Sequence, residues 1–173
     1  MLDLKIILAK FALKFPNIIL MNMDEKDKKL LILLQQDSKK TTKELADQLE
    51  MSVTAVFERI KKLERNKLIS KYVALVDKKL VKRDFVVLCH VKLLQHTKEH
   101  ITNFEREIVK FPEILECFHV SGDYDYILKI CLESIEEYRE FMVTKLTSMQ
   151  HIASTHSSFS IKEVKNSTVV FPG

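Results

Sequence analysis

The sequence of 173 residues lacks several features on which particular functions depend. It has only two glycines, one of them the C-terminal residue, and it shows no glycine-rich phosphate loop, nucleophile elbow or pair of catalytic carboxylates. No run of about eighteen uncharged apolar residues occurs, so no segment is expected to span a membrane. These absences argue against an enzyme built on one of those motifs and against a transmembrane protein.

Cysteine and histidine, the usual residues of disulfides and zinc sites, are badly spaced for either. The three cysteines are odd in number and each lies in an apolar run: Cys89, Cys117 and Cys131. This pattern favours buried thiols in a reducing cytoplasm. Among the histidines only His96 and His100 have a metal-like spacing, and they flank a predicted helix cap at Thr97 instead of sharing a helix face. We therefore expect no metal, no cofactor and a cytoplasmic location.

What is present is a balance of apolar and charged residues, at 46% and 30%, that is typical of a soluble globular protein. The charge divides unevenly along the chain. Residues 24–83 carry 16 Lys and Arg against 10 Asp and Glu, whereas residues 84–173 carry 9 against 13. Only the first half has the positive charge that binding to phosphates requires, so we expect two small domains, of which the first binds nucleic acid.

Residues 42–66 have the pattern of two short helices joined by a turn at residues 50–52. Ser52 is a good N-cap for the second helix, and Thr41 precedes Glu44 by the three residues of a capping box for the first. The apolar residues of the second helix recur at helical spacings and are Val53, Val56, Ile60 and Leu63. The first helix supplies Leu45 and Leu49. An earlier amphipathic segment supplies Leu30, Leu31 and Leu34. Three such helices predict a (winged) helix-turn-helix domain whose last helix enters the major groove, although basic helix faces are often merely solvated.

The second half of the chain has the periodicity of strands and helices in the order βαββαβ. The predicted strands are residues 85–93, 114–120, 124–132 and about 152–164. Thr97 caps the first helix, and Ser134 caps the second with Glu137 at the capping-box spacing. Gly122 marks a turn that needs a positive φ. The order predicts an α+β protein with a C-terminal ferredoxin-like domain, in which both helices cover one face of an antiparallel sheet.

The sheet face opposite the helices is expected to stay uncovered, yet it is too apolar for water. Its residues include Val86, Leu88, Ile127 and Cys131. We therefore expect a homodimer formed through this face, which also lets two helix-turn-helix domains grip two half-sites.

The first 22 residues are apolar with interspersed lysines and support three interpretations. The first interpretation is an extra amphipathic helix that Pro16 would break. The second is a targeting segment without a recognisable cleavage site. The third is that translation starts at Met21 or Met23. The divisions that we expect are residues 1–22 for this extension, 23–70 for the helix-turn-helix domain, 71–84 for a linker strand, 85–166 for the ferredoxin-like domain and 167–173 for a tail.

With both halves in place, the chain from Met23 to about Pro172 resembles the Lrp/AsnC family, the leucine-responsive or feast/famine regulators of bacteria and archaea. The resemblance is carried by the opening-helix pattern, Leu45-Ala46, the run from Ser52 to Arg59, the Gly-Asp-Tyr-Asp-Tyr turn and the later SSFSIKEVK. It implies a transcription factor that binds double-stranded DNA and senses an amino acid between dimers. The C-terminal domains of such a factor dimerise and assemble further, often to octamers.

By position, the resemblance places DNA contacts on the second helix of the motif and at the start of the first: Thr42, Ser52, Thr54, Ala55, Glu58, Arg59, Lys61 and Lys62. Arg59 is the candidate for a base edge because its planar fork matches guanine O6 and N7, while Lys61 and Lys62 suit phosphates. Glu58 either contacts a base or pairs with Lys62 within the helix.

The positions matched to the effector pocket are Gly122, Asp123, Asp125, Met149 and Ile152. An exposed carboxylate beside a glycine turn could hold an α-amino group, or Asp123 could simply shape the turn. The chain departs from the family pattern twice. Asn66 follows the recognition helix where glycine is usual, and Gln150-His151 stands where Pro-Gly usually precedes the last strand.

Two other functions remain open from the sequence. Some haem-biosynthesis decarboxylases resemble the same two-domain plan and use histidines in the C-terminal cavity, but they would not need a basic recognition helix. An amino-acid sensor that does not bind DNA would lack the steep salt dependence of phosphate contacts. We expect a protein that is not an enzyme but a sequence-specific DNA-binding transcriptional regulator, responding to an amino acid or a related small metabolite.

Overall fold

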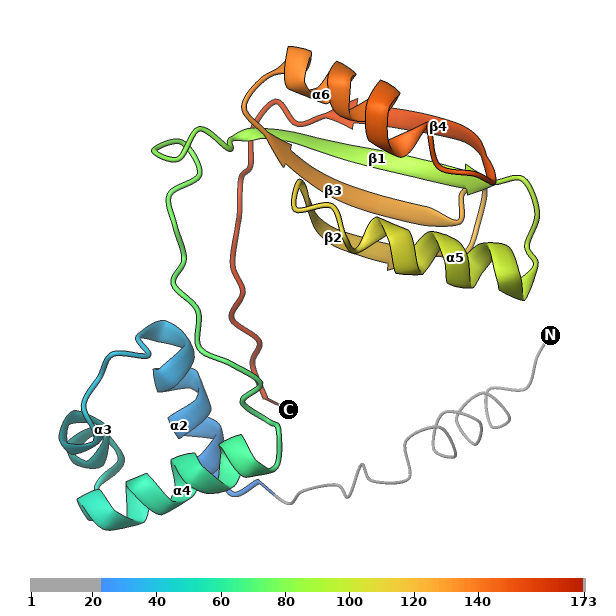
Figure 1. Ribbon diagram of the computed structural model, residues 1–173. Coiled ribbons are helices and arrows are strands. Elements are labelled where there is room, and N and C mark those ends of the chain that lie inside the picture. Colours follow the sequence, from blue (N-terminus) through green and yellow to red (C-terminus); the bar gives the residue numbers. More distant parts are fainter. Residues whose placement is uncertain (1–22, 173) are drawn as a thin grey trace. The chain divides into compact units, whose positions relative to one another are not determined.

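The computed structural model describes residues 23–172, so the segment 1–22 with its three interpretations lies outside the described residues, as does residue 173. The described residues form two compact units. Unit 1 comprises residues 23–73 and 167–172, and unit 2 comprises residues 74–166 (Figure 1). The division falls inside the predicted linker, and the predicted tail belongs to unit 1.

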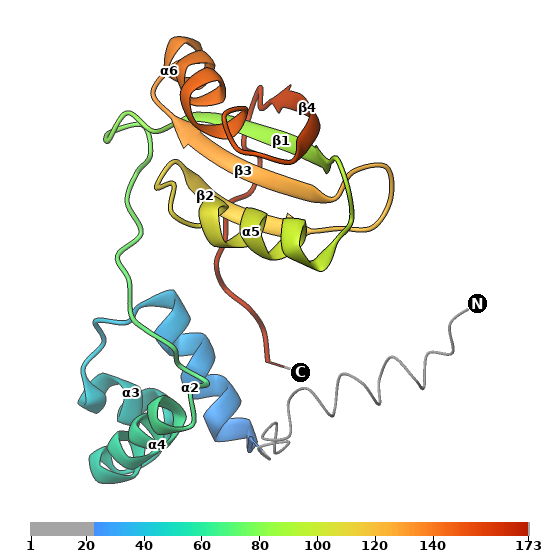
Figure 2. The ribbon, with the colours of Figure 1, turned by 45° about the vertical axis from the view of Figure 1, so that its right-hand side comes forward.

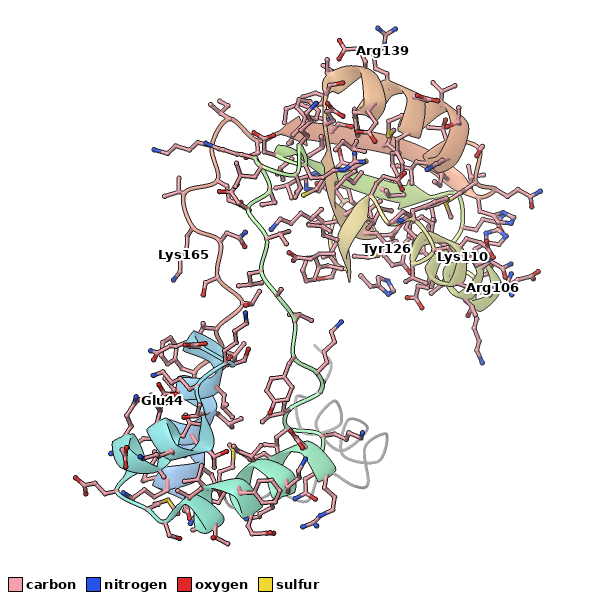
Figure 3. The ribbon with its side chains drawn as sticks, turned by 60° about the vertical axis from the view of Figure 1, so that its left-hand side comes forward. Glu44, Arg106, Lys110, Tyr126, Arg139 and Lys165 are labelled. Carbon is pink, nitrogen blue, oxygen red and sulfur yellow. The ribbon has the colours of Figure 1, made fainter. Side chains whose placement is uncertain are left out.

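Three helices build unit 1: α2 (Glu25–Gln36), α3 (Thr42–Leu49) and α4 (Val53–Arg65). Each begins where a side-chain oxygen of Asp24, Thr41 or Ser52 accepts a hydrogen bond from the backbone N–H three residues later. Glu44 completes the predicted capping box at the start of α3 (Figure 3). The core consists of Leu30, Leu34, Leu45, Ala46, Leu49, Val56 and Leu63. The predicted helix-turn-helix is thus confirmed, and residues 23–73 and 167–172 contain no strand that would form a wing.

Two details of unit 1 differ from the expectation. Val53, which the periodicity places in the buried stripe, has 49% of its surface exposed because it occupies the first position of α4, beyond the reach of the core. The left-handed residue that ends α4 is Lys67, with φ 61°, whereas Asn66 has φ −84°. The position that favours glycine therefore comes one residue later than the sequence pattern indicates.

Unit 2 has the elements β1 (Phe85–Leu93), α5 (Lys98–Ile108), β2 (Ile114–His119), β3 (Tyr126–Leu132), α6 (Ile135–Phe141), the π-helical turn η1 (Met142–Leu146) and β4 (Ile152–Phe159). The strands form one antiparallel sheet in the order β2-β3-β1-β4. Both helices pack on one face of it (Figure 2), where they share a core with the alternate residues of β1 and β3. This is the predicted ferredoxin-like arrangement.

The opposite sheet face is less open than expected. Val86 and Cys131 are buried, so the prediction was wrong for this end of the face, whereas Leu88 is 41% exposed. The chain after β4 lies near this end: Ser160 donates its backbone N–H to the Val86 carbonyl at 2.9 Å. Glu163 forms ion pairs with Lys78 at 2.5 Å and with Lys129 at 3.4 Å.

Several boundaries in unit 2 also differ. Residues 71–84 contain turns but no strand, and the last strand ends at Phe159. The capping box at Ser134 is half formed, because the Glu137 carboxylate accepts the backbone N–H of Glu133, and Arg83 donates to both of its oxygens. None of the helices in residues 23–172 is long and apolar enough to cross a membrane.

The three cysteines are free, and Cys89 and Cys131 are buried while Cys117 is half-buried. Burial raises the pKa of each thiol above its ordinary value, which keeps the thiols protonated and unreactive at neutral pH. The prediction of buried thiols is confirmed for Cys89 and Cys131. Residues 23–172 hold no group of three or more His, Cys, Asp or Glu side chains arranged to bind a metal ion.

Candidate nucleic-acid interface and ligand pocket

The surface of α4 that faces solvent is mixed in character. Its exposed side chains are Val53, Thr54, Phe57, Glu58, Lys61 and Arg65, with Ser52 exposed at the N-cap. Ala55 and Lys62 are half-buried at the edges of this surface, as is Thr42 at the start of α3. Most residues predicted to contact DNA are therefore at least partly accessible, and all of them except Thr42 lie on α4 or at its N-cap.

Arg59 is placed differently from the expectation that it points at a base edge. Its Nη1 lies 2.5 Å from Asp27 Oδ1 and 2.8 Å from Asp24 Oδ2, both at the start of α2. Only 25% of the Arg59 side chain is exposed, and Asp27 is 1% exposed. The guanidinium thus ties α4 to α2, because a buried carboxylate needs a partner for its charge.

The pKa values around this ion pair shift as the contacts require. Hydrogen bonding to Asp27 raises the pKa of Arg59 above its already high value. The pKa of Asp24 is lowered, first because its carboxylate accepts the backbone N–H of Asp27 and also because Arg59 lies beside it. Lys62 adds a second cation, with its Nζ 3.7 Å from Asp27 Oδ2.

Sequence reasoning missed Phe57, which lies outside the core with 46% of its surface exposed. Lys61 holds its Nζ 5.7 Å from the centroid of the Phe57 ring and 3.0 Å from Glu64 Oε2. The available signal was position: Phe57 directly follows buried Val56, and one residue along a helix turns the side chain by about 100° away from the apolar stripe.

The residues matched to an effector pocket differ in exposure and in their hydrogen-bond partners. Gly122 has φ 131°, as predicted, and both it and Asp123 are exposed. Asp125 is buried, and its Oδ2 accepts the backbone N–H of Leu93 at 2.7 Å while Oδ1 lies 3.2 Å from His96 Nδ1. Since both oxygens have protein partners, Asp125 holds the turn against the end of β1.

A groove of about 440 Å³ lies between α5 and η1 and includes one of the predicted residues, Met149. Its lining is Asn103, Phe104, Arg106, Glu107, Phe111, Thr144, Lys145, Ser148, Met149, Gln150 and His151. Figure 3 shows Arg106 projecting from α5. Two of its cations have partners, since Arg106 Nε lies 3.1 Å from Glu107 and Lys145 Nζ 2.5 Å from Glu113. The lining of the groove combines apolar side chains with charges of both signs.

The loop at the end of this groove explains one departure from the family pattern. His151 has φ 77°, a left-handed conformation that glycine adopts without steric cost. Its ring stacks on that of His100, with centroids 3.7 Å apart. The chain therefore keeps the backbone shape that glycine favours and adds an aromatic contact to α5.

Comparison with known proteins identifies both units. Residues 23–64 match the AsnC-type helix-turn-helix domain, and residues 86–170 match the Lrp/AsnC ligand binding domain. The chain belongs to the Lrp/AsnC family. It is similar to the Bkd operon transcriptional regulator of Pseudomonas aeruginosa, with 30% identity over 82% of this chain and 93% of that protein. The glutamate uptake regulatory protein of Zymomonas mobilis is 32% identical over 86% of this chain and 90% of that protein.

Solved structures of Lrp/AsnC proteins have the same fold. An AsnC family transcriptional regulator from Agrobacterium tumefaciens is 30% identical with a TM-score of 0.82, over 86% of this chain and 96% of that chain. A transcriptional regulator from Neisseria meningitidis, solved as a complex with L-Met, is 28% identical with a TM-score of 0.81, over the same shares. The similar proteins are DNA-binding transcriptional regulators, so the decarboxylase interpretation finds no support among them.

Proposed function

We propose that this Lrp/AsnC regulator binds double-stranded DNA as a homodimer through the solvent face of α4, and that an amino acid modulates the binding. One observation carries the proposal: α4 is capped and packed on one side, while its other side presents polar and basic groups on a unit of positive charge. A helix so placed can enter the major groove with its N-terminal residues at base edges.

The residues take different roles in this proposal. Thr54, Ala55 and Glu58 face the bases, and Ser52, Thr42 and Lys61 hold phosphates on either side. Lys62 reaches a phosphate from the edge of the helix, because 42% of its side chain is exposed. Arg59 becomes a positioning residue, since turning its guanidinium toward a base would leave the buried Asp27 carboxylate with only the more distant Lys62.

Dimerisation is proposed through the sheet face opposite the helices. Leu88 and Phe118 are large apolar side chains that remain exposed there, and Ile127 is half-buried between them, paired in register with Phe118. Large apolar side chains exposed together on one sheet face support an interface there, although Lys129 and His90 lie among them. The further assembly to an octamer that the resemblance implies is part of the proposal and rests on the family alone.

The proposed effector is an amino acid that contacts the Gly122–Asp123 turn and the Met149–Ile152 loop. Support comes from the L-Met complex of the Neisseria relative and from the exposed Asp123 carboxylate, which suits an α-amino group. Asp125 supports the turn without contacting the ligand, because its oxygens are already engaged. Free, buried thiols are compatible with a protein that functions in a reducing cytoplasm.

Binding to the protein's own upstream DNA, measured by fluorescence anisotropy over a salt series, tests the DNA-binding part. With roughly six to ten phosphate contacts, the affinity should fall about 10³- to 10⁵-fold between about 50 and 200 mM salt. Lys61→Ala should weaken binding to all DNA sequences nearly equally. If the protein is a monomer and does not bind duplex DNA at low ionic strength, the proposal is contradicted.

A thermal-shift screen of the twenty amino acids tests the effector. A ligand present at about 100 times its Kd should add about 2.7 kcal/mol to the unfolding free energy. Asp123→Ala should reduce this gain, while Glu140→Ala, an exposed carboxylate on α6, serves as the matched control and should leave it unchanged. A gain that Asp123→Ala leaves intact would place the ligand elsewhere.

A further inference from the structure

The solvent face of α4 carries an apolar pair that neither the fold nor the proposed contacts use. Val53 and Phe57 are 49% and 46% exposed and lie four residues apart, so their side chains stand one above the other on the helix. Neither belongs to the core of unit 1, where Val56 and Leu63 are fully buried. Lys61 continues the same row at the next turn, with its ammonium beside the Phe57 ring.

The composition of this row indicates what it meets. A partner that buries Val53 and Phe57 must offer apolar groups, and a partner that accepts Lys61 beside them must offer negative charge. Duplex DNA offers both, because the thymine 5-methyl group is the apolar feature of the base edges in the major groove, and phosphates line the groove. A purely apolar protein surface would take the charged Lys61–Glu64 pair out of water and offer it no hydrogen bond in return.

The spacing of the pair fits thymines about two base steps apart. Four residues of an α-helix advance by about 6 Å, and successive bases of one strand are about 3.4 Å apart along the duplex axis. Two apolar side chains on one helix row can therefore reach methyl groups about two steps apart. Val53, at the first position of α4, stands among the residues that a recognition helix directs at base edges.

We propose that Val53 and Phe57 contact the 5-methyl groups of thymines about two base steps apart in each half-site, so that the regulator selects thymine at those positions through its methyl group. This inference rests on the proposed insertion of α4 into the major groove. It adds residues that read the sequence without hydrogen bonds. Burying a methyl group contributes about 0.8 kcal/mol, which corresponds to roughly a fourfold change in affinity.

Uracil interference tests the contact and does not require the operator sequence to be defined. The upstream DNA is prepared with uracil replacing a fraction of the thymines at random, which removes only the methyl group. Bound and free DNA are separated, and the uracil positions are mapped by cleavage with a uracil glycosylase. We expect uracil to be depleted from the bound fraction at paired positions about two steps apart. A fully uracil-substituted site should bind roughly fourfold more weakly for each contacted methyl.

Two variants assign the effect to side chains. Phe57→Ala should weaken binding to thymine DNA and abolish the preference at one position of each pair, while Phe57→Leu keeps part of it. Lys61→Ala is the matched control on the same row and should weaken thymine and uracil DNA by the same factor. Since Phe57 lies outside the core, its substitution should leave the far-ultraviolet circular dichroism spectrum unchanged.

The outcomes separate this inference from the proposed function. Specific, salt-dependent binding that is equally tight for thymine and uracil DNA would overturn the inference and leave the function standing. If the unaltered protein does not bind DNA at all, both the inference and the proposed function are overturned. If Phe57→Ala changed the oligomeric state and left the thymine preference intact, the row would be a protein contact, and the inference would be overturned.

Discussion

Replacing Arg59 by methionine should destabilise unit 1 by about 3 kcal/mol. The substitution keeps an unbranched apolar stem but leaves the Asp27 carboxylate, which is 1% exposed, without the guanidinium 2.5 Å away. Removing one partner of a buried ion pair costs about 3–5 kcal/mol. We take the lower end because Lys62 remains 3.7 Å from the other oxygen and because a quarter of the Arg59 side chain is exposed.

A double variant distinguishes a lost partner from lost packing. Asp27→Leu combined with Arg59→Met removes both charges, and such replacements of a buried ion pair are often neutral. The double variant should therefore recover most of the stability that Arg59→Met loses. Arg65→Met, which changes an exposed arginine on the same helix, is the matched control and should stay within about 0.5 kcal/mol of the unaltered protein.

The assay must report on unit 1 separately, because the chain has two units. Amide hydrogen exchange of α2 and α4 under native conditions gives the local free energy of opening, with β1 and β3 of unit 2 as an internal reference. A loss below about 1 kcal/mol for Arg59→Met, with no recovery in the double variant, would refute the reasoning. If that variant also lost base discrimination, Arg59 would have the base-edge role that the sequence suggested.

Three further predictions follow from other contacts. The pKa of Asp24 is lowered in the folded protein. Its contribution to stability is therefore complete above its ordinary pKa of 3.8 and disappears as the pH falls through the lower folded pKa. Asp24→Asn should flatten the acid side of the curve of unfolding free energy against pH, measured by urea unfolding. Lys67→Gly should stabilise unit 1 by about 0.5–1 kcal/mol in the same assay, because glycine relieves the strain at φ 61°; a loss of stability would contradict this. Leu88→Asp should convert a dimer to a monomer in sedimentation experiments without unfolding unit 2, and an unchanged dimer would exclude this sheet face as the interface.

The parts of the fold that depend on local chemistry were predictable from the sequence. Thr41 and Ser52 cap helices because their hydroxyls satisfy backbone N–H groups only three residues away. The alternation along β1 likewise assigns one face to the core, because strand side chains alternate strictly. Such signals lie within a few residues of the feature that they specify, so one sequence is enough to read them.

The features that were missed depend on partners distant in the sequence or on irregular backbone. Arg59 was predicted to contact a base edge because its ion-pair partner, Asp27, is 32 positions away and no neighbouring residue indicates the pairing. Phe141 was not assigned to the core, because the π-helical turn after it shifts the later side chains relative to a regular 3.6-residue period.

The tail of the chain returns to the first unit. The side-chain amide of Gln35 on α2 accepts the backbone N–H of Val170 at 2.7 Å and donates to its carbonyl at 2.8 Å, as a neighbouring strand would. Residues 74–166, which form unit 2, thus lie within the sequence of unit 1. A fluorophore or affinity tag fused after residue 172 would therefore be attached to unit 1, and its signal would report on the helix-turn-helix.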